Sequence, residues 1–325
     1  MRSLIGWSLE MSGVGLLKAA PLLSKLPAGT RIYVPALPAD PPSAIEEALV
    51  LLRRENPGLI PVPHIAASRE VSVASLESRL AAWQRVSSDS VREVLIVRGD
   101  PRGAHDTDSA AAAASSPSGP FRTSLDLLET GVLQRCGVDA VSLCGHPEGI
   151  AAAGLSADAA RAQLRAKLQW ADASGVRARV VTQFCFDAAT ATGYVDSLRA
   201  DGLSVDVSLG VVSPDVSVAT RVRMAARCDV TPPTSGFATP YFRRIAKWHA
   251  QRGEVAGAQA LHLYPFGGLR KCLAKMHAFT NDDSVHYAGG GRVGEARPAA
   301  IEYPNFLLEP PVPDAFDSGD RLPPK

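Results

Sequence analysis

The sequence lacks the features that mark secreted, membrane and nucleic-acid-binding proteins. Its 34 Lys and Arg residues nearly balance 33 Asp and Glu residues, so no excess charge favours nucleic acid or an acidic membrane as partner. No apolar run approaches the length that spans a membrane. Met1–Glu10 lacks the charged start, long apolar stretch and small-residue cleavage site of a signal peptide. We therefore expect a soluble, cytoplasmic protein.

Cysteine is scarce as well. The five cysteines are scattered, odd in number and never arranged as a C-x-x-C pair. This pattern is typical of reduced cytosolic thiols, and it argues against a disulfide framework or a structural zinc site. We therefore expect no bound metal.

Short apolar runs alternate with longer segments of helical periodicity along most of the chain. Such alternation predicts parallel strands joined by crossover helices. Eight units favour an α/β fold of the (β/α)8 TIM-barrel type as one catalytic domain over residues 1–280, and an open doubly wound sheet is the alternative. The expected strands are Ser3–Glu10, Arg31–Pro35, Ile60–His64, Glu93–Val97, Ala140–Leu143, Arg179–Phe184, Val205–Leu209 and Ala260–Leu263.

Helical spacing and cap residues mark the segments between these strands. Gly137, Gly175 and Gly202 each follow a helical segment, as C-terminal glycine caps do. Asp187 is expected to be the N-cap of the helix after the sixth strand. The expected helices are Ser43–Asn56, Val73–Gln84, Ser124–Cys136, Ala159–Ser174, Ala188–Asp201, Ser217–Cys228 and Gly267–Phe279.

Two stretches interrupt the alternation. Gly99–Pro120 is small and polar, which predicts a long loop between the fourth strand and its helix. Asn281–Lys325 is rich in glycine at its start and proline at its end. We expect residues 281–325 to form an extended tail on the barrel or on a partner subunit.

Polar residues gather where the expected strands end. In TIM barrels these ends form the face that carries the active site. A single polar strand end is usually a cap or a solvated rim, but the coincidence over five or more ends favours an active-site mouth. Cys144, His146 and His64 could also converge there on zinc, which is an alternative. The strand-end residues are Glu10, His64, Arg98, Gly99, Asp100, Cys144, His146, Gln183 and Tyr264.

Five motifs in order, together with Glu10 in SLEM, resemble the methylenetetrahydrofolate reductase family in its bacterial form without a regulatory domain. The motifs are PHIA (Pro63–Ala66), VRGD (Val97–Asp100), SLDLLETG (Ser124–Gly131), GHPEG (Gly145–Gly149) and TQFCFD (Thr182–Asp187). The resemblance implies an eight-stranded barrel that holds FAD. It also implies ping-pong chemistry: NADH or NADPH passes a hydride to FAD and leaves, and methylenetetrahydrofolate is then reduced to methyltetrahydrofolate.

The resemblance also implies roles for individual residues. Glu10 matches the family's general acid, which protonates the departing folate nitrogen, and we expect partial burial to raise its pKa. Asp100 matches the aspartate near the flavin pyrimidine, where it tunes hydride transfer and contacts folate. Gln183 matches a glutamine that hydrogen-bonds the pterin; its alternative is a glutamine satisfied by neighbouring backbone. Thr220 and Met224 occupy positions of substrate-binding residues.

Further positions match the family's FAD site. His64, Arg98 and Lys167 correspond to groups that hold the ribityl chain and the diphosphate. For Lys167 the alternative is a solvated basic helix face shared with Arg161 and Arg165. The remaining expected FAD contacts are Gly99, Asp100, Cys144, His146 and Gln163.

The chain departs from the family pattern at several positions. Ala36 replaces a hydroxyl residue, His146 replaces a tyrosine, and Gly268 replaces an arginine that reaches the folate tail. Two other readings therefore stay open: a flavin-free folate-dependent one-carbon transferase, and a non-catalytic or partner-dependent folate-binding barrel. We also expect a homo-oligomer, a dimer or larger, and the sequence does not decide between NADH and NADPH.

Overall fold

The structure is a computed structural model of the chain. It describes residues 7–37, 39–99, 120–214, 216–228, 230–233, 240–242, 244–245, 247–248, 260–266 and 268–280. Most of the expected loop after the fourth strand (residues 100–119, with Asp100) and the expected tail (281–325) lie outside these residues. None of the helices within the described ranges combines the length and the hydropathy that a membrane span requires.

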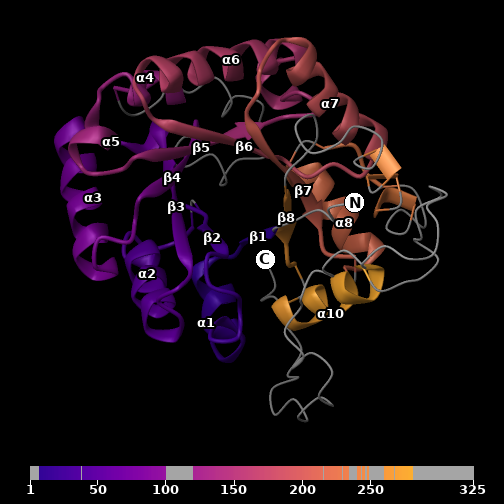
Figure 1. The fold of residues 1–325 in the computed structure, drawn as a ribbon, viewed down its shortest axis with the longest axis horizontal. Coiled ribbons are helices and arrows are strands. Elements are labelled where there is room, and N and C mark those ends of the chain that lie inside the picture. The colour runs from indigo at the N-terminus through magenta and orange to yellow at the C-terminus, as the bar shows by residue number, and fades with distance from the viewer. Residues whose placement is uncertain are drawn as a thin grey trace, which may run out of the picture.

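Eight parallel strands close into a barrel in sequence order, with β8 paired to β1 (Figure 1). The predicted (β/α)8 TIM barrel is therefore confirmed, and the open sheet is wrong. Closure brings Trp7 beside Leu261 and Leu9 beside Leu263, although more than 250 residues separate these partners in the chain. The strands are β1 (Trp7–Glu10), β2 (Arg31–Val34), β3 (Ile60–Ala66), β4 (Glu93–Val97), β5 (Ala140–Gly145), β6 (Arg177–Thr182), β7 (Asp206–Val212) and β8 (Ala260–Tyr264).

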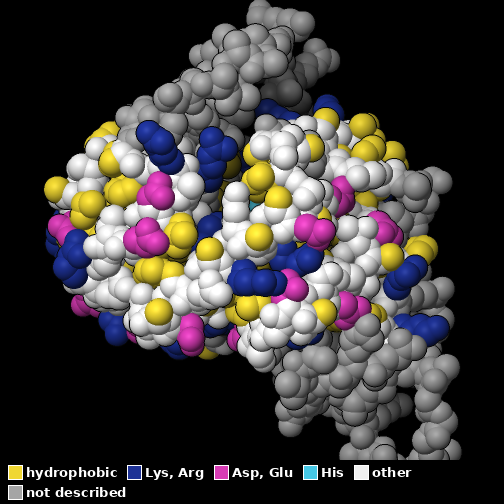
Figure 2. Space-filling model, turned by 90° about the horizontal axis from the view of Figure 1, so that it is seen from above, with side chains coloured by type: hydrophobic (Ala, Val, Ile, Leu, Met, Phe, Trp, Pro, Cys, Tyr) yellow, Lys and Arg dark blue, Asp and Glu magenta, His cyan; other side chains and the backbone are white. Residues whose placement is uncertain are grey.

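Helices surround the barrel on its outer side (Figure 1). On the face that Figure 2 presents, basic and acidic side chains lie interspersed, in keeping with the balanced composition. The helices are α1 (Gly13–Leu23), α2 (Ala44–Glu55), η1 (Ala67–Arg69), α3 (Val73–Ser87), α4 (Ser124–Leu128), α5 (Val132–Arg135), η3 (Ala151–Ala153), α6 (Ala157–Ala173), α7 (Ala188–Ala200), α8 (Val218–Arg227) and α10 (Leu269–Thr280).

Two helix predictions need correction. No helix was predicted at α1, whose first turn contains glycines and whose later part contains Pro21. Pro21 lies inside this helix, where the lack of an N–H costs one backbone hydrogen bond. The single helix expected over Ser124–Cys136 is two short helices, since Gly131 adopts a left-handed conformation with φ +68° between them.

The predicted caps are confirmed. Gly137, Gly175 and Gly202 all have positive φ directly after a helix or its cap residue. Asp187 caps α7, because its carboxylate accepts hydrogen bonds from the backbone of Ala189 and Thr190.

Strand register divides the barrel interior into layers along its axis. The floor is an ionic cluster: Glu93 accepts hydrogen bonds from Arg31 at 2.9 Å and from Ser142 at 2.6 Å, and it pairs with Arg179 at 2.8 Å. Above this cluster lies an apolar layer formed by Tyr33, Val62, Leu95 and Val181. Because side chains alternate along strands, the inward residues one step further lie at the C-terminal mouth. They are Glu10, His64, Val97, Cys144 and Tyr264.

Candidate active site

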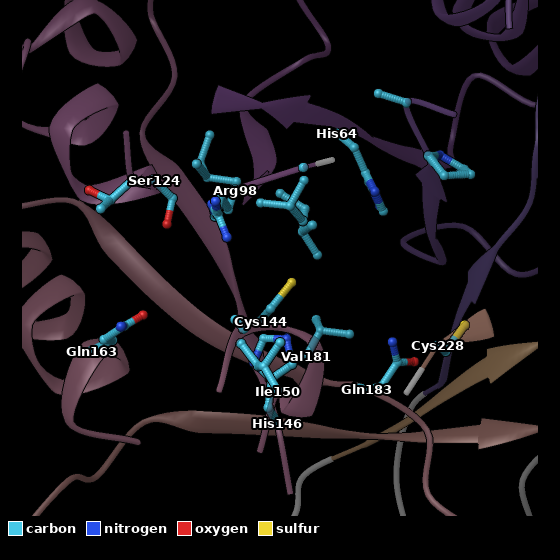
Figure 3. Close-up of a pocket in the computed structure, with 18 of the residues that line it drawn as sticks. His64, Arg98, Ser124, Cys144, His146, Ile150, Gln163, Val181, Gln183 and Cys228 are labelled. Carbon is cyan, nitrogen blue, oxygen red and sulfur yellow. The ribbon is translucent and has the colours of Figure 1, made fainter. Parts of the chain in front are cut away.

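A cavity of about 830 Å³ opens at the C-terminal mouth of the barrel (Figure 3). This size is typical of sites for small molecules and cofactors. Strand ends from β1, β3, β4, β5 and β6 supply much of its wall, and α6 closes one side. Nine predicted site residues line it: Glu10, His64, Arg98, Gly99, Cys144, His146, Gln163, Lys167 and Gln183.

One end of the cavity holds Glu10 between two histidines. Oε2 of Glu10 lies 3.4 Å from Nε2 of His262 on β8 and 3.7 Å from Nε2 of His64 on β3. In the part of the chain that the structure describes, no lysine or arginine forms an ion pair with Glu10. The imidazoles of His64 and His262 therefore stand where a strand-end glutamate ordinarily has a lysine or arginine partner.

The expected rise in the pKa of Glu10 is wrong in the ligand-free protein. Burial does raise the pKa of this carboxyl. The hydrogen bond from His262 and the charges of His64 and His262 outweigh burial, and the pKa lies below its ordinary value. The side chain is also 22% exposed, so water still reaches it. Glu10 is therefore a carboxylate before substrate binds.

His64 lies beside Glu10. Its ring is 7% exposed and meets Tyr33 edge to face, with the ring centroids 6.2 Å apart. Burial lowers the pKa of His64 to about 4, against the attraction of Glu10, so the imidazole is neutral at pH 7. Its Nε2 has no hydrogen-bond partner within the described ranges. A buried, neutral imidazole offers no positive charge to phosphates, the groups that the resemblance implies for His64. Its position suits contact with Glu10 instead.

Basic side chains gather on the wall formed by β4, α4 and α6. Arg98 follows β4, and Lys167 projects from α6. Burial lowers the pKa of Lys167, and neither side chain forms an ion pair with another described residue. Arg161 and Arg165 both form ion pairs with Asp201. Lys167 lines the cavity instead, so it does not share their solvated helix face.

Charge across the cavity is therefore unequal. Arg69 and Arg122 also line it, whereas Glu10 is the one acidic residue among the described lining residues. The excess of positive charge favours an anionic ligand. Arg98 and Gln163 lie on the same side of the close-up in Figure 3, across from Gln183.

Cys144 and His146 do not form a metal site. Burial raises the pKa of the Cys144 thiol to about 12, although the charge of Lys167 opposes this. Burial and Lys167 lower the pKa of His146 to about 4. Across the described residues, no group of three or more His, Cys, Asp or Glu side chains is arranged to hold a metal ion. The zinc alternative on Cys144, His146 and His64 has no structural support.

Gln183 stands just beyond the end of β6, which ends at Thr182 rather than at Phe184 as predicted. Its backbone N–H donates to the carbonyl of Gly145 at 2.8 Å, which fixes it at the cavity edge. Its side-chain Oε1 accepts from the backbone N–H of Phe184 at 3.0 Å. The alternative of a glutamine satisfied by backbone holds for the side-chain carbonyl, and the NH₂ group donates to no other described residue.

Gly210 on β7 keeps this strand end in place. Its backbone N–H donates to the hydroxyl of Thr182 at 2.8 Å. A Cβ at this position would collide with the carbonyl of Thr182 and lie 2.8 Å from the nitrogen of Phe184. Only glycine allows β7 to pass this close to the backbone that carries Gln183.

Gly210→Ala should displace Gln183 and destabilise the barrel. We expect the free energy of unfolding to fall by roughly 1–3 kcal/mol, as for overpacked interior sites. Chemical denaturation followed by circular dichroism measures this. Gly193→Ala is the control, since a Cβ there meets nothing within 4 Å and alanine favours the α7 helix. Equal stability of the two variants would contradict the steric argument.

The structure leaves two predicted substrate residues outside the cavity. Met224 is packed in the hydrophobic core with 9% exposure. Thr220 lies in the first turn of α8, where its backbone and hydroxyl both bond to Ser217. Neither is among the described lining residues. Of the departures from the family pattern, Ala36 and His146 line the cavity, whereas Gly268 adopts φ +110° before α10 and is not among those residues.

The sequence analysis missed Ser8 and His262. Their hydroxyl and ring Nδ1 lie 2.8 Å apart. Alternation along β1 carried a usable signal, because Ser8 and Glu10 are two residues apart and share the inward face. His262 is likewise two residues before Tyr264 on β8. The sequence around Ser8 and Glu10 gives no sign that His262 and Tyr264 lie next to them. Barrel closure, in which β8 pairs with β1, brings the two pairs together.

No protein-family model matches the chain. A solved structure of a short chain dehydrogenase from Mycobacterium thermoresistibile aligns with 12% sequence identity over 80% of this chain and 85% of that chain. The TM-score of this alignment is 0.27. A likeness at this level carries no argument about fold or function, so the case for function depends on the residues of the cavity.

Proposed function

We propose that the protein reduces methylenetetrahydrofolate to methyltetrahydrofolate with NADH or NADPH as hydride donor and FAD as cofactor. The observation that carries the proposal is one cavity that combines a partly buried carboxylate at Glu10 with cations at Arg98 and Lys167 that form no ion pair with another described residue. The motif resemblance supplies the identity of the ligands. The cavity supplies groups suited to each part of them.

The basic wall fits a diphosphate. Arg98 offers a planar fork of donors and Lys167 a partly buried ammonium, and both are suited to phosphate oxygens. FAD and the nicotinamide dinucleotides share this group, and Gln163 lines the same cavity and offers a further polar group. When bound, FAD supplies the hydride chemistry between nicotinamide and folate.

The acidic end suits the folate. Opening the bridged folate requires a proton on the departing nitrogen, and Glu10 is the described acid in the cavity that can hold one. A bound pterin would exclude the water that still reaches Glu10, which raises the pKa of a carboxyl. The amide NH₂ of Gln183 is placed to donate to an acceptor on the pterin edge.

The alternative functions lack a comparable observation. A thiolate–zinc transferase needs a metal cluster, which the described residues do not form. A non-catalytic folate-binding barrel gives no reason for a carboxylate flanked by two imidazoles. An absorption spectrum of the purified protein tests the cofactor: flavin bands support FAD, whereas a colourless protein that oxidises nicotinamide in the presence of folate would leave the dinucleotide as the ligand of the basic wall.

Lys167→Gln and Arg98→Gln should each weaken dinucleotide binding about tenfold, because a hydrogen bond to a charged group contributes roughly 1.5–3 kcal/mol. The loss should shrink at high salt, since Arg98 is exposed to solvent. Isothermal titration of the flavin-free protein with FAD measures the affinities. Lys18→Gln, on an exposed face of α1, is the matched control and should bind as the unmodified protein does. Unchanged binding in both wall variants would place the diphosphate elsewhere.

A further inference from the structure

The side chains behind Glu10 form a hydrogen-bonded chain across the seam of the barrel. Ser8 and Glu10 both face inward on β1, and His262 faces inward on β8, which pairs with β1. Ser8 Oγ lies 2.8 Å from His262 Nδ1, and His262 Nε2 lies 3.4 Å from Glu10 Oε2. The ring of His262 is fully buried and Ser8 is 5% exposed.

Ser8 and Glu10 together hold His262 in one orientation and one tautomer. A serine hydroxyl can donate to Nδ1, which leaves the ring proton of a neutral imidazole on Nε2. The opposite tautomer would direct the lone pair of Nε2 at a carboxylate oxygen, which is repulsive. A protonated ring donates from both nitrogens. In each favourable arrangement, His262 Nε2–H points its proton at Glu10.

The two oxygens of Glu10 have different surroundings. Both histidine contacts are made to Oε2, at 3.4 Å from His262 and 3.7 Å from His64. Oε1 has no hydrogen bond to any residue that the structure describes. The ring of Tyr33 supports His262, because the two rings pack edge to face with their centroids 4.7 Å apart.

We propose that Ser8 and His262 are positioning residues that anchor Oε2 of Glu10 and leave Oε1 to exchange a proton with the substrate. The inference rests on the proposed function for the identity of the substrate. It predicts that His262 restrains both the direction and the ionisation of the carboxylate. The 3.4 Å separation is long for a hydrogen bond, and contraction on substrate binding is a familiar property of catalytic groups.

Several titratable groups face Glu10, and any change in pH dependence must be separated from theirs. The charge of a protonated His64 on β3 lowers the pKa of Glu10, and the charge of Glu10 in turn raises the pKa of Cys144 on β5 and of Tyr264 on β8. The lowered pKa of His64 and the raised pKa values of Cys144 and Tyr264 keep all three uncharged near pH 7. His262 is the neighbour whose hydrogen bond opposes burial most strongly at Glu10.

Carboxyl-carbon NMR of the ligand-free protein tests the anchor without turnover. The Glu10 signal is the one that disappears in Glu10→Gln. In His262→Leu burial remains while the donor is lost, so Glu10 should titrate roughly one pH unit or more above the unmodified protein. His262→Gln keeps an amide donor, so the titration of Glu10 should shift less in this variant than in His262→Leu. An unchanged titration in His262→Leu would overturn the proposal.

Ser8→Ala provides a second, smaller perturbation. Ring-nitrogen NMR of His262 should show one tautomer, with the proton on Nε2, in the unmodified protein at neutral pH. In Ser8→Ala the carboxylate of Glu10 should keep this tautomer, but the ring is no longer held at Nδ1 and donates less well to Oε2, so Glu10 should titrate at higher pH than in the unmodified protein. Ser208→Ala is the matched control, because Ser208 is also a buried inward serine, on β7. An unchanged titration of Glu10 in Ser8→Ala would overturn the role of Ser8.

Steady-state kinetics connect the anchor to catalysis. In His262→Leu we expect kcat to fall about tenfold or more from misplacement of the acid, with a smaller change in KM and recovery in His262→Gln. One limb of the kcat/KM pH profile should be absent in Glu10→Gln and therefore report the ionisation of Glu10. In His262→Leu this limb should move to higher pH. Shifted titrations in a protein without reductase activity would overturn the proposed function alone; normal activity with unmoved titrations would overturn the positioning inference alone.

Discussion

Glu10→Gln should lower kcat for the reduction of methylenetetrahydrofolate by about 10²–10⁴-fold, the usual contribution of a general acid. The substitution keeps the shape of the side chain and its contact with His262, but an amide cannot deliver the proton that opens the bridged folate. Hydride transfer from the nicotinamide needs no proton from Glu10, so that half-reaction should keep its rate. Stopped-flow measurement of each half-reaction separates the two.

The control for this variant is Glu129→Gln, which makes the same chemical change at an exposed position after α4. It should retain full activity in both half-reactions. If Glu10→Gln reduced folate at the rate of this control, Glu10 would not be the acid. If both half-reactions slowed equally in Glu10→Gln, its role would be in binding or folding rather than in proton transfer.

Glu93→Gln should produce the largest loss of stability. Glu93 is 3% exposed at the barrel floor and satisfies Arg31, Arg179 and Ser142 at once. Loss of its charge leaves Arg31 without another counterion among the described residues and leaves Arg179 with only its 3.9 Å contact to Asp206. Breaking a buried pair costs about 3–5 kcal/mol, and we expect the lower end because both arginines retain some solvent contact.

Calorimetry or urea denaturation measures this effect. A loss of about 3 kcal/mol corresponds to a fall in Tm of roughly 4 °C for a chain of this size. Asp206→Asn is the matched control, because Asp206 lies 3.9 Å from Arg179 with 48% exposure and should contribute less than about 1 kcal/mol. Similar losses in the two variants would show that the floor cluster does not stabilise the fold through Glu93.

Local patterns predicted the architecture well because each βα unit carries its own signals. Alternating apolar runs located all eight strands, and Asp187 and the glycines after helices located several helix ends. Helix α1 was not predicted, and it contains Pro21 in its interior, a residue that ordinarily breaks helices.

The candidate site was harder to predict because its chemistry arises between strands. The polar strand ends correctly indicated which residues meet at the mouth. They did not indicate that His64 would lie against Glu10, or that Ser8 would bond to a histidine 254 positions away. Burial alone suggested a raised pKa for Glu10, whereas the direction depends on His262, which only barrel closure brings near.

The most direct test of the proposed function is anaerobic assay of the purified protein with methylenetetrahydrofolate and either NADH or NADPH. We predict stoichiometric oxidation of one nicotinamide and formation of methyltetrahydrofolate, together with a flavin spectrum that each competent nicotinamide bleaches. Failure of both nicotinamides to yield methyltetrahydrofolate, with the protein folded, would contradict the assignment of this cavity to folate reduction.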